Sequence, residues 1–355
     1  MPGLEFGALA ILVASGLHFA VSQTPPTQGG YSVIVQTTNQ TRASLLFQWY
    51  SGLGAFPPSD LNIVVPSGTP VNEWFPASLS ASSTQDGVTV YEHSQPGKNG
   101  QTFTLRVIES KDFSPIAKYQ NVDLAAQDIV MLQDDKMKVD SNTATTMVNV
   151  VNQRNEDPLF SGLYPRYIKN MKGSASVEAA TGGKFSDGIV YKTQGGGNDS
   201  LPFQLLKGRV FVVNNVLRAV QNYTLWMKAE GEFEGDFSSS KCGDIPTFAG
   251  LSTAHDLVNE YPFCDDISFQ YFTQVVRERH HRVTQAWVEE CPELEKFEAA
   301  RGGGGHPEDK TICLQALNCL MGFGPTEYPL FTRDGDRGFG QEDHEHVDPN
   351  SVGVC

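Results

Sequence analysis

Short apolar segments separated by turn residues are the feature that most constrains the fold of this chain. From residue 31 to residue 132 these segments are β-branched or aromatic, and clusters rich in Pro, Gly, Asp and Ser separate them. Such regular spacing is typical of antiparallel sandwiches and barrels. We therefore expect an antiparallel β-sandwich over residues 23–150. Its strands would be YSVIVQTT, ASLLFQWYSG, LNIVVPSG, GVTVYEH, QTFTLRVIES and DIVML.

The length of the chain predicts a second domain. At 355 residues it exceeds the usual size of one domain. Residues 134–158 are polar and end in Pro158, which is typical of a linker. We expect a second domain over residues 159–290 and a Cys-containing helical and acidic tail over residues 291–355.

The second domain is predicted to be an α+β unit. Strands are expected at 209–213, 223–229 and 267–275, the last because apolar and polar residues alternate along it. Helices are expected at 277–290 and 313–320. The predicted fold class is mainly β or α+β.

The N-terminal residues predict a secreted, extracellular protein. Residues 6–21 carry no charge, and small residues follow at Ala20 and Ser22, which is typical of a signal peptide cleaved after residue 22. A membrane anchor is the alternative, but a span needs about 20 apolar residues. No later segment approaches that length, so we expect no integral membrane segment after cleavage. Three sequons, at Asn39, Asn198 and Asn222, predict glycosylation.

All six cysteines lie in the last third of the sequence, and no Cys-x-x-Cys pair occurs. In an oxidising compartment an even number of cysteines predicts disulfides, while their pairing stays open. The cysteines are Cys242, Cys264, Cys291, Cys313, Cys319 and Cys355. The net charge of −15 disfavours nucleic acid as a partner.

Four features between residues 175 and 276 occur together. They are Phe185–Lys192 followed by Asn198-Asp199, then Asn222-Tyr223-Thr224-Leu225, the spacing of Cys242 and Cys264, and Ile267-Ser268-Phe269-Gln270. In these features the segment resembles cystatins, the family that inhibits papain-like cysteine proteases. The resemblance implies a helix wrapped by an antiparallel sheet, a disulfide between Cys242 and Cys264, and hairpin loops that enter a protease cleft. Residues 31–135, with Trp49, are similar to fibronectin type III and other Ig-like sandwiches.

The first protease-contact loop departs from the cystatin pattern Gln-x-Val-x-Gly. Losing its Gly removes the residue that lets the backbone approach a protease closely. We expect the cystatin fold to persist and inhibition to be lost. The loop positions are Val216, Leu217, Arg218, Ala219 and Val220.

No catalytic motif, cofactor site or phosphate-binding glycine loop is evident. The tail offers weak metal ligands, for which a solvated acidic segment is the favoured interpretation. These ligands are Asp334, Asp336, His344 and His346.

The sequence thus predicts a secreted, non-enzymatic binding protein whose partner is an extracellular protein or a matrix component. One alternative is an inhibitor of papain-like cysteine proteases. The other is an enzyme whose catalytic residues lie far apart in the sequence and leave no local motif.

Overall fold

A computed structural model gives the three-dimensional structure of the chain. It describes residues 30–75, 78–85, 87–152, 160–162, 165–192, 205–206, 208–214, 219–234, 242–272, 275 and 307–324.

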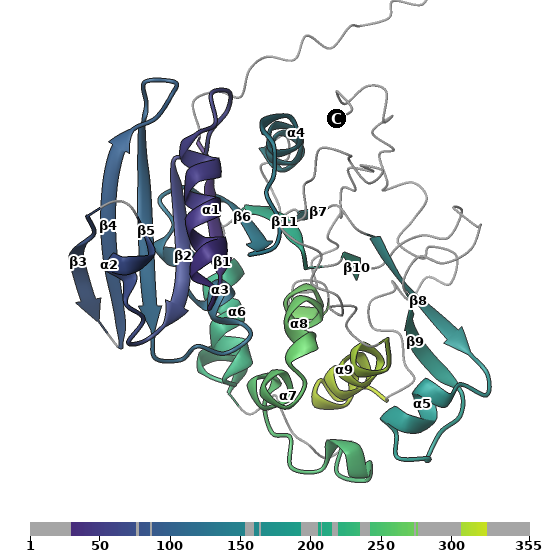
Figure 1. Ribbon diagram of the computed structural model, residues 1–355. Coiled ribbons are helices and arrows are strands. Elements are labelled where there is room, and N and C mark those ends of the chain that lie inside the picture. The colour runs from purple at the N-terminus through teal and green to yellow at the C-terminus, as the bar shows by residue number, and fades with distance from the viewer. Residues whose placement is uncertain are drawn as a thin grey trace, which may run out of the picture.

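The centre of the fold is an open, mixed eight-stranded sheet with the order β3-β4-β5-β2-β1-β6-β11-β7 (Figure 1). Four neighbouring strands, β5, β2, β1 and β6, are parallel, and the two flanks pair antiparallel. The strands are β1 (Ser32–Gln36), β2 (Asp60–Pro66), β3 (Ser80–Gln85), β4 (Val88–Pro96), β5 (Thr102–Ser110), β6 (Ile129–Asp134), β7 (Phe160–Gly162) and β11 (Val210–Asn214). This α/β architecture corrects the predicted mainly β fold with its antiparallel sandwich.

The segment between β1 and β2 explains the error. Residues 43–52 were expected to form a strand, but α1 (Gln40–Ser51) occupies this stretch. Its buried side chains recur at helical spacing and are all apolar, namely Ala43, Leu46, Phe47 and Tyr50. The Asn39 side chain caps the helix by accepting a hydrogen bond from the Arg42 N–H. The resulting β1-α1-β2 crossover makes these strands parallel.

Helices cover both faces of the sheet, and each face has its own core. Alternate residues of β1 enter different cores, Val33 and Val35 on one face and Ile34 on the other. The first face packs against α1 and α4 (Ser141–Asn152). The second packs against α3 (Ala117–Gln120), α6 (Ala219–Met227), α7 (Ala254–Glu260), α8 (Asp265–Tyr271) and α9 (Pro307–Leu320). Parallel strands buried on both faces explain the continuous apolar runs of the sequence.

The central sheet includes strands from both sides of the predicted boundary at residues 150–159, because β11 pairs with β6 and with β7. A smaller antiparallel sheet has the order β10-β8-β9. Its strands are β8 (Pro165–Met171), β9 (Gly188–Lys192) and β10 (Leu205–Leu206). Two short helices, α2 (Val71–Trp74) and α5 (Ala175–Ala180), complete the fold.

The prediction of a cystatin-like module is also wrong. Two segments that were expected to be strands, 223–229 and 267–275, overlap the helices α6 and α8 instead. In α6, Tyr223, Trp226 and Met227 are buried at helical spacing, while residues 266–271 of α8 are buried all round. The polar residues of α8 that resembled the wet face of a strand are therefore interior residues. Helix α9 includes the segment 313–320 that was expected to be helical.

Among the parts of the chain that the structure describes, none of the helices combines the length and the apolar character needed to span a bilayer.

Candidate active site at the carboxyl edge of the sheet

The parallel strands create a topological switch point between β1 and β6. Strand β2, which follows α1, pairs with one side of β1, and β6 pairs with the other. Crossovers therefore leave in opposite directions at this point, and ligands of open α/β sheets bind in the crevice outside the carboxyl ends of the strands there. Gln36 and Asp134 are register partners at these ends.

Two consecutive carboxylates, Asp134 and Asp135, lie at the carboxyl end of β6. Asp135 accepts hydrogen bonds from the Thr37 hydroxyl at 2.6 Å and from Arg42 Nη1 at 3.1 and 3.2 Å. Thr37 follows β1 and Arg42 lies in the first turn of α1, so both neighbouring elements hold Asp135. The Asp134 side chain is 42% exposed and can meet a ligand from solvent.

A buried cation connects Asp134 to a second acidic group. Lys118 Nζ lies 3.4 Å from Asp134 Oδ1 and 3.8 Å from Asp265 Oδ2. Its backbone N–H donates to Gln36 Oε1, which fixes α3 against the end of β1. Burial alone would lower the pKa of Lys118, but Asp134, Asp265 and Asp266 raise it above its usual value. Lys118 is therefore a permanent positive charge inside the site.

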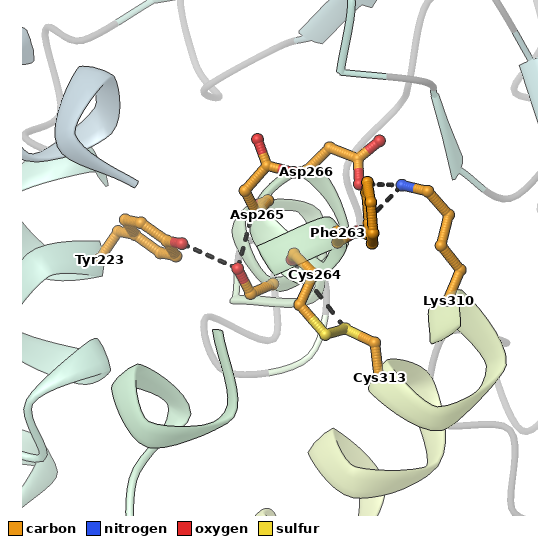
Figure 2. Close-up of a disulfide and its surroundings, with 8 residues drawn as sticks. Tyr223, Phe263, Cys264, Asp265, Asp266, Lys310 and Cys313 are labelled. Atoms are coloured by element: carbon orange, nitrogen blue, oxygen red, sulfur yellow. Dashed lines mark hydrogen bonds and ion pairs between the residues drawn. A yellow bond between two sulfur atoms is a disulfide. The ribbon is translucent and has the colours of Figure 1, made fainter. Parts of the chain in front are cut away.

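Helix α8 supplies the second acidic group, Asp265 and Asp266 (Figure 2). Asp266 is buried and accepts a 2.6 Å bond from Lys310 Nζ on α9 and a 2.9 Å bond from the Gly208 N–H. Position 208 requires glycine because an added Cβ would lie 2.5 Å from Asp266 Cβ. These contacts hold the start of α8 rigidly on the second face of the sheet.

Further contacts fix the orientation of α8. The Ser268 hydroxyl donates to the Asp265 carbonyl and shares a 2.8 Å hydrogen bond with the Tyr223 hydroxyl. A disulfide joins Cys264, directly before α8, to Cys313 of α9 (Figure 2). Asp265 is therefore presented from a fixed backbone.

The pKa of Asp265 is raised from 3.8 to about 6. Burial is the largest cause and the charge of Asp266 adds to it, whereas Lys118 and Lys310 oppose it. At neutral pH the carboxylate is ionised, yet it binds a proton far more readily than an exposed Asp. That is the property of a general base that works near pH 7.

The donor set fits a small divalent cation that is completed by its substrate. The described residues contain no group of three or more His, Cys, Asp or Glu side chains that could hold a metal ion by itself. Mg²⁺, however, is commonly bound by one or two carboxylates together with substrate phosphates. Asp134 and Asp135 are two carboxylates at the switch point, and a cation bound there would compete with Lys118 for Asp134 and with Arg42 for Asp135.

The described residues of the predicted protease-contact loop form part of a helix and not a hairpin. Ala219 and Val220 begin α6, and Val216, Leu217 and Arg218 lie outside the described residues. The weak metal candidates Asp334, Asp336, His344 and His346, the predicted helix at 277–290 and the apolar leader at residues 6–21 also lie outside the described residues. Secretion and an extracellular partner therefore stay predictions.

The predicted glycosylation is not supported. Asn39 caps α1 at the edge of the sheet that carries the site, where a glycan would crowd the switch point. Asn222 lies in α6 beside the fully buried Tyr223. Asn198 falls outside the described residues.

The disulfide implied by the cystatin resemblance is not the one that forms. Cys264 bonds to Cys313, and Cys242 lies beside Cys319 instead. The physical reason is that α9 packs between the segment before α8 and the small sheet, which brings its cysteines to this region. Cys291 and Cys355 lie outside the described residues.

Sequence reasoning missed Asp134, Lys118 and Asp265. The first was assigned to a linker and the last was placed just before a strand. One signal was available: an acidic pair one residue after the buried run IVML marks the carboxyl end of a parallel strand. Nothing local marks Lys118 as a member of the site.

No protein-family model matches the chain, and no curated protein matches it either. Among solved structures, a crystal structure of residues 1–349 of S. aureus TarS is similar with a TM-score of 0.31 and 12% sequence identity. The match covers 84% of this chain and 73% of the TarS chain. A similarity at this level is too distant to assign a reaction.

The predicted non-enzymatic binding protein and the protease inhibitor are corrected together with the fold. The binding-protein prediction rested in part on β-rich modules and the inhibitor prediction on the cystatin-like module, and the residues that the structure describes form neither an Ig-like sandwich nor a cystatin fold. The switch point of an open parallel sheet is where such sheets bind ligands.

Proposed function

We propose that the chain is an enzyme that transfers a sugar from a nucleoside diphosphate donor to a hydroxyl acceptor. One observation carries the proposal. The paired carboxylates Asp134 and Asp135 lie at the β1/β6 switch point and are connected through Lys118 to Asp265, the carboxylate with the raised pKa.

The diphosphate of the donor would bind at the carboxyl edge of β1 and β6. The N-terminus of α1 begins directly after β1, so its positive dipole end favours a phosphate there. Arg42 in the first turn adds a fixed positive charge. Asp134 and Asp135 would hold a divalent cation together with the diphosphate, and that cation would stabilise the negative charge of the leaving group.

Asp265 would act as the general base. It accepts the proton of the acceptor hydroxyl while the hydroxyl oxygen forms a bond to the anomeric carbon of the sugar. The bond from that carbon to the diphosphate oxygen breaks, and its electron pair leaves with the nucleoside diphosphate. Lys118 holds Asp265 and Asp134 at one place, which keeps the proton acceptor near the departing diphosphate.

Phosphoryl transfer of the P-loop class is disfavoured by the sequence. Enzymes of that class cradle the transferred phosphate in a glycine-rich loop that ends in Gly-Lys followed by Ser or Thr. The sequence contains no such motif.

The test has a binding arm and a catalytic arm. In the first, uridine, guanosine, adenosine and cytidine diphosphates are titrated with Mg²⁺ or Mn²⁺, and the thermal midpoint is followed. One of them should raise the midpoint of the wild type, and Asp134→Asn should weaken its binding by about tenfold or more through lost cation affinity. In the second, release of that nucleoside diphosphate from its sugar conjugates is measured.

Asp265→Asn should retain donor binding and lose at least about a hundredfold in turnover, because removing a general base has effects of that order. The control is Asp128→Asn, which removes the same charge from an exposed position. The proposal fails if no nucleoside diphosphate binds, or if Asp265→Asn turns over the donor at the wild-type rate.

A further inference from the structure

Helix α9 makes a second cysteine contact with the segment that precedes α8. Cys242 and Cys319 are both fully buried and are not disulfide-bonded in this structure. The two thiols are neighbours, because Cys319 is the first cause of the raised pKa of the Cys242 thiol. Cys242 Sγ also lies 3.9 Å from the carbonyl oxygen of Ala316, one turn before Cys319. The two thiols therefore belong to one packed contact between residue 242 and the last turn of α9.

The surroundings decide which cysteine chemistry this contact allows. Ile245, Phe248, Leu317 and Leu320 belong to the same apolar core cluster as the two cysteines. The neighbouring thiol of Cys319, followed by burial, raises the pKa of the Cys242 thiol above its usual range. A thiol that stays protonated is a poor nucleophile and a poor metal ligand. Two neighbouring buried thiols can, however, form a structural disulfide before the chain closes around them.

We propose that Cys242 and Cys319 form a second disulfide when the chain folds in an oxidising compartment. The oxidant is a small disulfide of the glutathione class. One cysteine thiolate attacks it and releases one small thiol, and the other cysteine then attacks the mixed disulfide and releases the second. Two protein thiols and one small disulfide thus become one protein disulfide and two small thiols. Because both sulfurs are buried in the folded chain, the exchange takes place during folding or after local opening.

The second disulfide would attach α9 to the 242–264 segment at two points, through Cys313 and through Cys319. Helix α9 also carries Lys310, which holds Asp266 next to Asp265. Oxidation of the pair would therefore stiffen the support of the acidic group on α8. The chemistry of the pair itself does not rest on the proposed function.

The test is peptide mapping of the full chain folded in a glutathione redox buffer. Remaining thiols are blocked by alkylation under denaturing, non-reducing conditions before trypsin cleavage. Trypsin leaves Cys242 and Cys264 together in the peptide 242–277, and Cys313 and Cys319 together in the peptide 311–333. The wild type alone therefore cannot separate the two pairs.

Two double variants separate them. In Cys264→Ser/Cys313→Ser the two peptides should stay linked, through Cys242 and Cys319. In Cys242→Ser/Cys319→Ser they should stay linked through the other pair, and the thermal midpoint should fall by about 5 °C relative to the oxidised wild type.

In the wild type, alkylation of all four cysteines should be absent. Alkylated Cys242 and Cys319 in correctly oxidised wild type would overturn the proposal, and so would a link from either of them to Cys291 or Cys355. If a double variant fails to fold, either of these two wild-type results still overturns the proposal.

Discussion

Replacing Asp265 by Asn should stabilise the folded protein at neutral pH while it removes the proposed general base. The Asp265 side chain is 24% exposed and its pKa is raised from 3.8 to about 6, chiefly by burial and then by Asp266. The folded protein therefore disfavours the ionised form of this side chain, even with Lys118 beside it. An uncharged residue of the same shape does not carry that cost.

The magnitude follows from the two pKa values. A rise of about 2 units corresponds to about 3 kcal/mol in the free energy of unfolding. Below the unfolded value of 3.8, Asp265 is protonated in both states and the wild type carries no penalty. Between 3.8 and about 6 the unfolded chain loses this proton first, so the contribution of Asp265 to stability falls as the pH rises. Above that window the penalty is complete.

Urea unfolding of both proteins, followed by tryptophan fluorescence at pH of about 4.5, 6 and 8, measures the difference. The stability of Asp265→Asn minus that of the wild type should be about 1 kcal/mol at the lowest pH and approach about 3 kcal/mol at the highest. Asp128→Asn, the exposed control, should show no such growth. A difference that does not change with pH, or a variant less stable than the wild type at pH of about 8, would refute the assigned pKa and its cause.

Three further substitutions test the scaffold of the site. Lys310→Met should cost about 3–5 kcal/mol because it leaves a buried Asp266 carboxylate without its ion-pair partner, and adding Asp266→Asn should restore part of that loss in a double-mutant cycle. Trp226→Ala should cost about 3–5 kcal/mol, since this fully buried ring packs on the face that carries α8, and a smaller change in urea unfolding would contradict that packing. Asn39→Ala should cost about 1 kcal/mol through loss of the α1 cap, with an unchanged mass on secretory expression if Asn39 carries no glycan.

The sequence by itself located most strands of the central sheet. The runs in β1, β2, β5 and β6 are apolar and β-branched, and local propensity is enough to recognise them. The same information was present for α1, whose apolar residues follow helical spacing from Ala43 to Tyr50. Treating that segment as a strand turned a parallel crossover into an expected sandwich, because strand direction depends on what connects the strands.

Only the tertiary structure decided which strands pair and which charges meet. Parallel pairing joins segments through long connections, so no local pattern specifies that β6 lies beside β1. The same packing sets α3 and α8 against one edge of the sheet, where Lys118 comes within hydrogen-bonding or ion-pair distance of Asp134 and Asp265. The raised pKa of Asp265 follows from burial and from these neighbours. A sequence carries the residues of such a site, but the desolvation and the distances that give them their chemistry arise only when the chain is packed.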